Sequence, residues 1–134
     1  MKQITVAAAI IVNTQNQLLL VRKKNTQCFM QVGGKLEVGE APEVSLLREI
    51  EEEIGCKAQI EQFIGRFETA TANEPDHQLI SYVYYVKLEQ EPQIQAEIAE
   101  MIWLDIDDEQ TVNLAPLTKQ IVIPWIKQSN LQPA

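Results

Sequence analysis

The sequence has few cysteines and few basic residues, and each shortage argues against a class of protein. Its two cysteines, Cys28 and Cys56, form no CxxC pair and no spacing with histidine that would indicate a metal site or a disulfide framework. We therefore expect a reducing compartment, the cytoplasm. The 11 Lys and Arg residues are outnumbered by 19 Asp and Glu, giving a formal net charge of −8. This balance argues against a nucleic-acid polymer as partner, because phosphate binding needs clustered basic side chains.

Long apolar runs and targeting signals are missing as well. No segment approaches the roughly 20 apolar residues of a membrane-spanning helix, so we expect no membrane partner. The short apolar run "VAAAIIV" is followed by no small-residue cleavage pattern, which argues against a cleaved signal peptide. The acidic balance does not exclude a small phosphorylated ligand, because a bound divalent cation can reverse the local field.

The sequence does contain the strand and helix patterns of one domain, which we assign to residues 1–134. Residues 4–12 and 18–23 are predicted to form a hairpin, and three glycines (Gly33, Gly34 and Gly39) are predicted to mark a loop. The other strand-like segments are residues 28–32, 59–72, 78–89 and 100–106. A closing helix is expected at residues 114–128, with a kink or an end near Pro124. Strands and helices in mixed order predict an α+β or α/β sandwich.

A helix is predicted between Pro42, which suits a first helical turn, and Gly55, which suits a C-terminal stop. Apolar residues recur inside it at intervals of three and four, which predicts one buried side. These residues are Val44, Leu46, Leu47, Ile50 and Ile54. We expect the rest of the helix surface to face solvent.

Glutamates are crowded on this helix in a way that needs an explanation. Glu49, Glu52 and Glu53 stand at i, i+3 and i+4 and span an arc of about 100°, which we expect to lie opposite Val44 and Leu47. Like charges at this spacing repel by roughly 0.2–0.5 kcal/mol per pair. Three convergent carboxylates suit a hard divalent cation such as Mg²⁺, which would relieve the repulsion. The alternative is an ordinary surface helix rich in glutamate.

The residues around this helix follow one longer pattern, in which a glycine is followed after five residues by a glutamate and after seven more by Arg-Glu. The Arg-Glu pair is followed by an apolar residue, any residue and Glu-Glu. The pattern ends with any residue, a glycine and a final apolar residue. The matching positions are Gly34, Glu40, Arg48, Glu49, Ile50, Glu52, Glu53, Gly55 and Cys56. The pattern resembles the signature of the Nudix hydrolases, although Val32 stands where the family commonly has proline. The resemblance implies an α/β/α sandwich with a mixed sheet flanked by helices.

The resemblance also implies a metal centre. Glu49, Glu52 and Glu53 would hold Mg²⁺ or Mn²⁺ together with the carbonyl of Gly33, and Arg48 would orient the carboxylates. Family members often carry a further glutamate in a later loop that binds metal or accepts a proton from water. We assign this role to Glu97 rather than Glu100, while Glu52 and Glu53 remain alternatives for the base.

Substrate-binding residues are expected around the same loop. Arg22 or Lys23 resembles a family position that meets the substrate phosphates, and a guanidinium suits a phosphate fork. Lys35, which follows the paired glycines, is assigned to the same set. Phe29 either stacks on a base or fills the core.

The implied activity is metal-dependent hydrolysis of a diphosphate linkage in a nucleoside diphosphate derivative. We favour (d)NTPs, including oxidised ones, with ADP-ribose or a nucleotide sugar as the alternative substrate. A non-catalytic nucleotide-sensing domain is the rival from another class, and such domains usually lose box carboxylates, all of which are present here. The expected partner is a small nucleotide, and the sequence leaves open whether the chain forms a homodimer.

Overall fold

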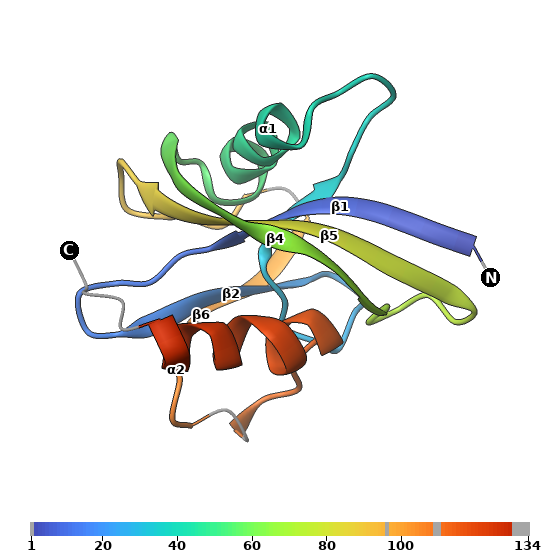
Figure 1. Ribbon diagram of the computed structural model, residues 1–134. Helices are drawn as coiled ribbons and strands as arrows, with labels where there is room; N and C mark the ends of the chain where they lie inside the picture. The colour runs from blue at the N-terminus through green and yellow to red at the C-terminus, as the bar shows by residue number, and fades with distance from the viewer. Residues whose placement is uncertain (1, 96, 109–110, 130–134) are drawn as a thin grey trace.

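The computed structural model describes residues 2–95, 97–108 and 111–129, and its strands form two sheets. The strands are β1 (Lys2–Ile10), β2 (Gln17–Lys23), β3 (Val32–Lys35), β4 (Ala58–Ala70), β5 (His77–Leu88) and β6 (Ile98–Asp105). A four-stranded mixed sheet has the order β3-β1-β5-β4, in which β1 and β5 run parallel. Strands β2 and β6 form a separate antiparallel pair (Figure 1).

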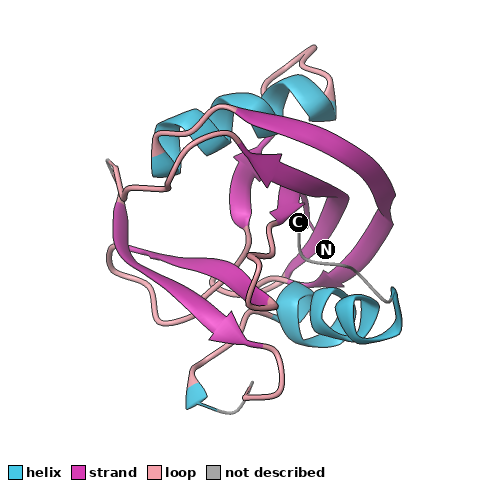
Figure 2. Ribbon diagram, turned by 90° about the vertical axis from the view of Figure 1, so that its left-hand side faces the viewer, coloured by secondary structure: helices cyan, strands magenta, loops and turns pink. Residues whose placement is uncertain are grey.

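Two helical segments cover opposite sides of the strands (Figures 1 and 2). Helix α1 (Pro42–Ile54) lies on one side, and the π-helical segment η2 (Thr118–Val122), which continues into α2 (Ile123–Ser129), lies on the other. Pro124 therefore does not end the closing helix; the helix instead adopts the wider π geometry just before it. In the described residues no helix is long and apolar enough to cross a membrane. The predicted sandwich of helices around a mixed sheet is confirmed.

Strand β1 separates two apolar cores because its side chains alternate between the two faces of the sheet. Ala7 and Ala9 pack with Leu46 and Ile50 of α1. Ala8 and Ile10 pack in a second core, whose helical members are Leu117, Val122, Ile123 and Ile126. Burial of these apolar side chains is the main favourable term that holds both helical segments on the sheet.

The predicted hairpin forms only at its turn. Val12 and Leu18 make an isolated antiparallel bridge, and the N–H of Leu19 donates to the carbonyl of Ile11 at 2.9 Å. Beyond this point the strands enter different sheets, because β1 already has β3 on one edge and β5 on the other. Strand β2 pairs instead with β6, which lies far away in the sequence.

The glycine-rich segment is also organised differently from the prediction. Of the predicted strand at residues 28–32, Phe29 and Met30 form only isolated bridges, and Val32 begins the regular strand β3, which includes both Gly33 and Gly34. Of the three glycines predicted to mark a loop, only Gly39 lies in a turn. Local glycine content predicted a loop here because it carries no information about the antiparallel partner that β1 provides.

Helix α1 has the predicted limits but a different buried side. Pro42 lies in the first turn, and Gly55 ends the helix in the left-handed conformation with φ 67°. Leu46, Ile50 and Ile54 are buried, whereas Val44 is 59% exposed. Leu47, also expected to be buried, is 36% exposed. The buried side is therefore rotated toward the glutamates, so the carboxylate arc adjoins the core instead of lying opposite to it.

Candidate active site

The two glycines of β3 allow the side chains of α1 to approach the sheet. At Gly33, with φ 153°, a Cβ atom would lie 2.0 Å from the carbonyl oxygen of Ala7. At Gly34 a Cβ atom would lie 2.5 Å from the Oε2 atom of Glu49. Only glycine fits either position without a shift of its neighbours, so these residues bring the backbone of β3 and the carboxylates of α1 together.

Glu53 is the most buried carboxylate of the arc, at 7% exposure. The backbone N–H of Gly33 donates to its Oε1 at 3.2 Å, and the Nζ of Lys23 lies 3.5 Å from its Oε2. Burial raises the pKa of Glu53 to about 7 despite these two partners, which act in the opposite direction. Burial is also the main reason that the pKa of Glu49 is raised.

Arg48 links the remaining carboxylates into what we call the acidic network, formed by Glu40, Arg48, Glu49, Glu52 and Glu53. Its guanidinium forms two hydrogen bonds to Glu40, from Nε at 3.0 Å and from Nη2 at 2.9 Å. Its Nη1 donates to Glu49 at 2.8 Å and reaches Glu52 at 3.4 Å. The two-pronged bond lowers the pKa of Glu40 to about 2 and raises that of Arg48.

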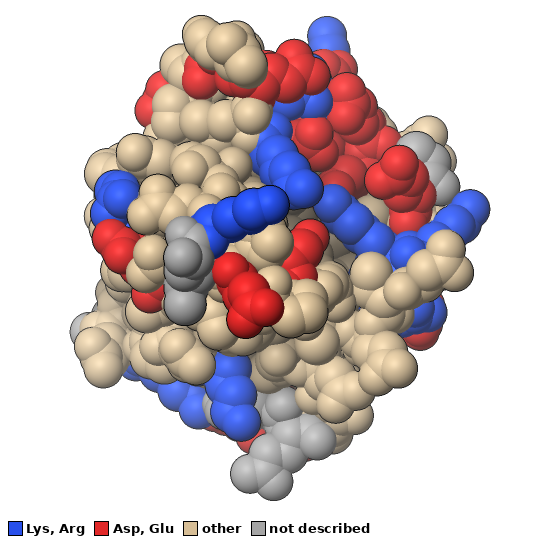
Figure 3. Space-filling model, turned by 90° about the vertical axis from the view of Figure 1, so that its right-hand side faces the viewer, with Lys and Arg blue, Asp and Glu red and all other residues tan. Residues whose placement is uncertain are grey.

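Negative charge exceeds positive charge at this place. Figure 3 shows acidic side chains gathered in one region of the face, with basic side chains directly beside them. The carboxylates of Glu49 and Glu52 are engaged with Arg48, and that of Glu53 with Lys23 and Gly33. Across residues 2–95, 97–108 and 111–129 no three Asp, Glu, His or Cys side chains are grouped as a metal site. The donor types suit a hard cation, but their present partners are protein groups.

Glu97 comes close to this region through the backbone. Its carbonyl oxygen accepts a hydrogen bond from the N–H of Lys24 at 2.8 Å, so residue 97 lies beside the end of β2, where Lys23 is located. The N–H of Gln95 donates to the backbone carbonyl of Glu53 at 3.0 Å, which holds the same segment against the end of α1. The side chain of Glu97 is exposed.

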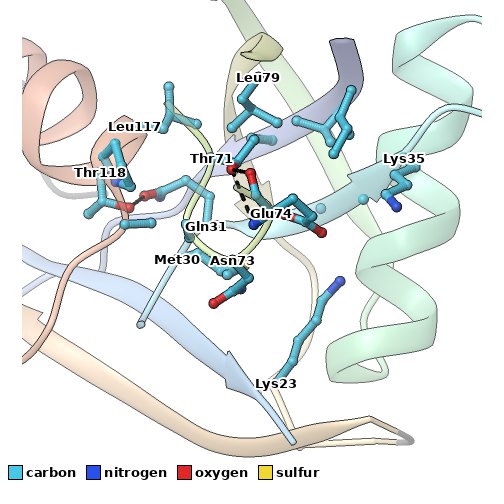
Figure 4. Close-up of a pocket in the computed structure, with 18 of the residues that line it drawn as sticks. Lys23, Met30, Gln31, Lys35, Thr71, Asn73, Glu74, Leu79, Leu117 and Thr118 are labelled. Carbon is cyan, nitrogen blue, oxygen red and sulfur yellow. Dashed lines mark hydrogen bonds between the residues drawn. The ribbon is translucent and has the colours of Figure 1, made fainter. Parts of the chain in front are cut away.

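A cavity of about 240 Å³ lies beside the acidic network. Its apolar wall includes Ile4, Val6, Ala8, Met30, Leu79 and Leu117. Gly33 and Gly34 line it, as do Lys23 and Lys35, whose amino groups appear in Figure 4 on the side near α1. The turn after β4, residues 71–74, closes another side. Gly33 and Lys23 of the cavity wall therefore also contact the acidic network, through Glu53.

Arg22 and Phe29, assigned to substrate binding from the sequence, lie apart from this cavity. The Nη2 and Nε of Arg22 donate to one oxygen of Glu100 at 2.6 and 2.9 Å, and its Nη1 donates to the carbonyl of Thr26 at 2.8 Å. Phe29 is 7% exposed and packs in the core beneath α2. Of its two predicted roles, the structure therefore favours core packing.

Comparison with known proteins identifies the family to which this arrangement belongs. The family model described as the NUDIX domain matches residues 1–126. The chain belongs to the Nudix family. The Nudix box, Gly34 to Cys56, covers the end of β3, the following loop and all of α1. Its last apolar position, Cys56, is fully buried in the core beneath α1.

Individual Nudix relatives differ in what they are named for. An 8-oxo-dGTP diphosphatase from Haemophilus influenzae is 39% identical over 89 residues, covering 63% of this chain and 62% of that protein. An ADP-ribose pyrophosphatase from Methanocaldococcus jannaschii is 33% identical over 82 residues, covering 59% of this chain and 48% of that protein. The match thus spans about half to two thirds of the length of these curated relatives.

A solved structure covers nearly the whole chain. The crystal structure of a UDP-X diphosphatase superposes with a TM-score of 0.76 at 30% identity, covering 99% of this chain and 67% of that one. The Nudix fold predicted from the box is therefore confirmed. The names of the relatives cover several nucleotide classes.

Sequence reasoning missed the polar residues of the cavity wall, above all Gln31 and Thr118. Both are buried, at 6% and 0% exposure, and both line the cavity. Neither belongs to the Nudix box. The available signal was weak: Gln31 follows the apolar residues Phe29 and Met30, and Thr118 follows Pro116 and Leu117.

Proposed function

We propose that this Nudix protein hydrolyses a diphosphate linkage in a nucleotide, with the nucleoside in the cavity and the diphosphate at the acidic network. One observation carries this proposal: Gly33 and Lys23 line the cavity and also contact Glu53 of the acidic network. A mainly apolar pocket with a few convergent polar groups suits a nucleoside. Carboxylates beside lysines suit a diphosphate and a cation that neutralises it.

The acidic network offers the oxygen donors that a divalent cation needs. Glu49, Glu52 and Glu53 would hold Mg²⁺ or Mn²⁺, with the carbonyl of Gly33 and the carboxylate of Glu97 as further ligands. When bound, the ion neutralises charge on phosphate oxygens and makes a water molecule easier to deprotonate. All these donors are hard oxygen atoms, which fits Mg²⁺ and Mn²⁺.

The chain's own side chains supply positioning and proton transfer. Lys23 and Lys35, both at the cavity, would bind phosphate oxygens as point charges. Arg48 would hold the carboxylates in place through its bonds to Glu40 and Glu49. Glu52, Glu53 and Glu97 are the candidates for the general base that takes a proton from the attacking water.

For the substrate we favour (d)NTPs, including oxidised ones. The 8-oxo-dGTP diphosphatase from H. influenzae supports this choice, with 39% identity. A nucleotide sugar or ADP-ribose is the second candidate, supported by the UDP-X diphosphatase structure, whose match covers 99% of this chain. Both candidates contain the diphosphate linkage on which the proposal depends.

The test is phosphate release with a panel of nucleotides, using pyrophosphatase for (d)NTPs and alkaline phosphatase for nucleotide conjugates. The panel is 8-oxo-dGTP, dGTP, ATP, UTP, ADP-ribose and UDP-glucose, each with Mg²⁺, with Mn²⁺ and with EDTA. Glu52→Gln should lower kcat by about 100-fold or more, a size typical of lost electrostatic stabilisation of a transition state. Glu51→Gln is the matched control, because Glu51 lies outside the arc and is exposed.

Two outcomes would contradict the proposal. If the wild-type protein releases no phosphate from any nucleotide with either metal but binds nucleotides in EDTA, a sensing domain is favoured. If Glu52→Gln retains wild-type turnover, the carboxylate arc is not the reacting centre.

A further inference from the structure

A buried amide forms part of the cavity wall opposite the charged groups. Gln31, just before β3, is 6% exposed and lines the cavity. Figure 4 shows its side chain turned toward Thr118, from the first turn of η2. Burying a primary amide is costly unless its donors and acceptors are used, so hydrogen-bond partners are expected for this side chain.

The orientation of this amide follows from its partners. The Nε2 of Gln31 donates to the backbone carbonyl of Ala9 at 3.1 Å. A carbonyl oxygen can only accept, so the NH₂ group must face Ala9 and Oε1 must face the other way. The hydroxyl of Thr118, which is fully buried, donates to that Oε1 at 2.7 Å. A flipped amide would place two acceptors against each other at Ala9, so one orientation is strongly preferred.

These two bonds use only half of the amide. A primary amide has two N–H donors and two acceptor lone pairs, so one donor and one acceptor of Gln31 remain. Both belong to one planar group, on a residue that lines the cavity. Another polar side chain of the wall is used within its own turn: the hydroxyl of Thr71 donates to the backbone carbonyl of Glu74 and accepts from the backbone N–H of Glu74.

We propose that Gln31 selects the nucleobase of the substrate. Its remaining N–H and carbonyl pair with an adjacent acceptor and donor on the edge of a base, as a planar amide pairs with adenine in protein–DNA complexes. Thr118 is a positioning residue that keeps the amide turned the right way. This inference rests on the proposed function in one respect, namely that the nucleoside occupies the cavity.

The order of the donor and the acceptor on the amide decides which bases Gln31 should distinguish. Gln31 can satisfy a base only if the donor and acceptor stand in the matching order, and a mismatched base would leave its buried amide groups unpaired. Sites that read a polar edge discriminate more strongly than apolar pockets for this reason. The Kd for the weakest-binding base divided by the Kd for the tightest-binding base, which we call the base ratio, therefore reports on Gln31.

The experiment measures binding of AMP, GMP, CMP and UMP by calorimetry to the wild type and to Gln31→Met, which has similar volume and no amide. The ratio of the weakest to the tightest Kd should shrink by about tenfold in Gln31→Met, as expected for the loss of two neutral hydrogen bonds. Ribose 5-phosphate, which has no base, is the control ligand. Its Kd should be unchanged, whereas a general collapse of the site would weaken it too.

Thr118 provides a matched pair of variants. Thr118→Val keeps the shape and removes the hydroxyl donor, so it should reduce the base ratio by about threefold to tenfold. Thr118→Ser keeps the donor and should retain the wild-type ratio. Equal losses in both variants would mean that only packing at Thr118 matters and would contradict its positioning role.

The inference and the proposed function fail in different ways. An unchanged base ratio in Gln31→Met, or a wild-type protein that binds all four monophosphates equally, would overturn the role of Gln31. Base-selective binding lost in Gln31→Met, in a protein that releases no phosphate from any nucleotide, would support Gln31 and overturn hydrolysis instead.

Discussion

The acidic network and the cavity lie next to each other, yet they are held in place by different interactions. The acidic network is held mainly by ionic contacts, with Arg48 bonded to Glu40, Glu49 and Glu52. Away from Lys23 and Lys35 the cavity wall is mainly apolar, and its buried polar groups Gln31 and Thr118 are neutral. Ionic contacts respond to pH, salt and bound cations, whereas buried neutral hydrogen bonds do not. Changes on the two sides should therefore produce separable effects.

The largest effect is expected where the two regions meet. Gly33→Ala places a Cβ atom 2.0 Å from the backbone oxygen of Ala7, in a conformation with φ +153° that side chains rarely adopt. We expect a loss of unfolding free energy of about 3–5 kcal/mol, measured by urea denaturation, because backbone atoms of the central strand must move.

Gly65→Ala is the matched control for this change. Its φ of +158° carries similar strain, but the nearest atom is the ring of Phe67 at 2.9 Å, which can move. The loss there should be clearly smaller. Equal losses in the two variants would show that backbone conformation, and not the contact with Ala7, requires glycine at position 33.

The next effect concerns the acidic network, whose contribution to stability should depend on pH. The folded protein raises the pKa of Glu53 from 4.5 to about 7, so between these values the folded state keeps a proton that the unfolded state releases. Stability therefore falls as pH rises through this window, by at most about 3 kcal/mol. We expect this fall in urea denaturation with EDTA present, and we expect Glu53→Gln to remove most of it.

Glu51→Gln serves as the control because Glu51 lies on the same helix and is exposed. It should keep the wild-type dependence on pH. A Glu53→Gln protein whose stability falls as steeply as the wild type between about pH 4.5 and 7 would mean that other groups cause the dependence.

The two regions also differ in how far the sequence alone could predict them. The Nudix box fixes the limits of α1 through Pro42 and Gly55 and places the glutamates correctly along the chain, because these signals are local. The buried side of the helix was predicted less well, since Val44 and Leu47 continue the apolar period without meeting the sheet. Amphipathic spacing identifies a helix better than it identifies the side that meets its partner.

The cavity depends on contacts that no local pattern contains. Gln31 and Thr118 are 87 positions apart, and neither carries a motif. Gly33 and Gly34 were read as a loop, because a strand that contains two glycines is recognised only through its pairing with Ala7 and Ala8. Non-local pairing decides both cases, and the sequence contains it only implicitly.

The third substitution should have a smaller effect, because it displaces only one carboxylate of the acidic network. Gly34→Ala brings a Cβ atom within 2.5 Å of the Glu49 carboxylate, which is the movable end of a side chain. Glu49 should shift at little cost in stability, while kcat/KM falls by about 100-fold because catalytic groups tolerate little misplacement. Phosphate release and urea denaturation together measure both effects.

Gly39→Ala should show the opposite result. Gly39 has φ +76° and no atom within 4 Å of an added Cβ, so alanine would lose about 1 kcal/mol of stability through backbone strain and keep its activity. If Gly34→Ala loses stability and keeps its activity, the position of Glu49 has no part in the reaction.

The smallest effect tests the geometry of the ionic contacts rather than their charge. Arg48→Lys retains the positive charge but cannot make the two-pronged bond to Glu40 while also donating to Glu49. We expect kcat/KM to fall by about tenfold, equivalent to about 1.4 kcal/mol of transition-state stabilisation, with binding of ribose 5-phosphate unchanged. Arg66→Lys changes an exposed pair with Glu68 on β4 and should leave turnover unaltered. If Arg48→Lys turns over like the wild type, positive charge alone organises the carboxylates, and the guanidinium fork has no part in catalysis.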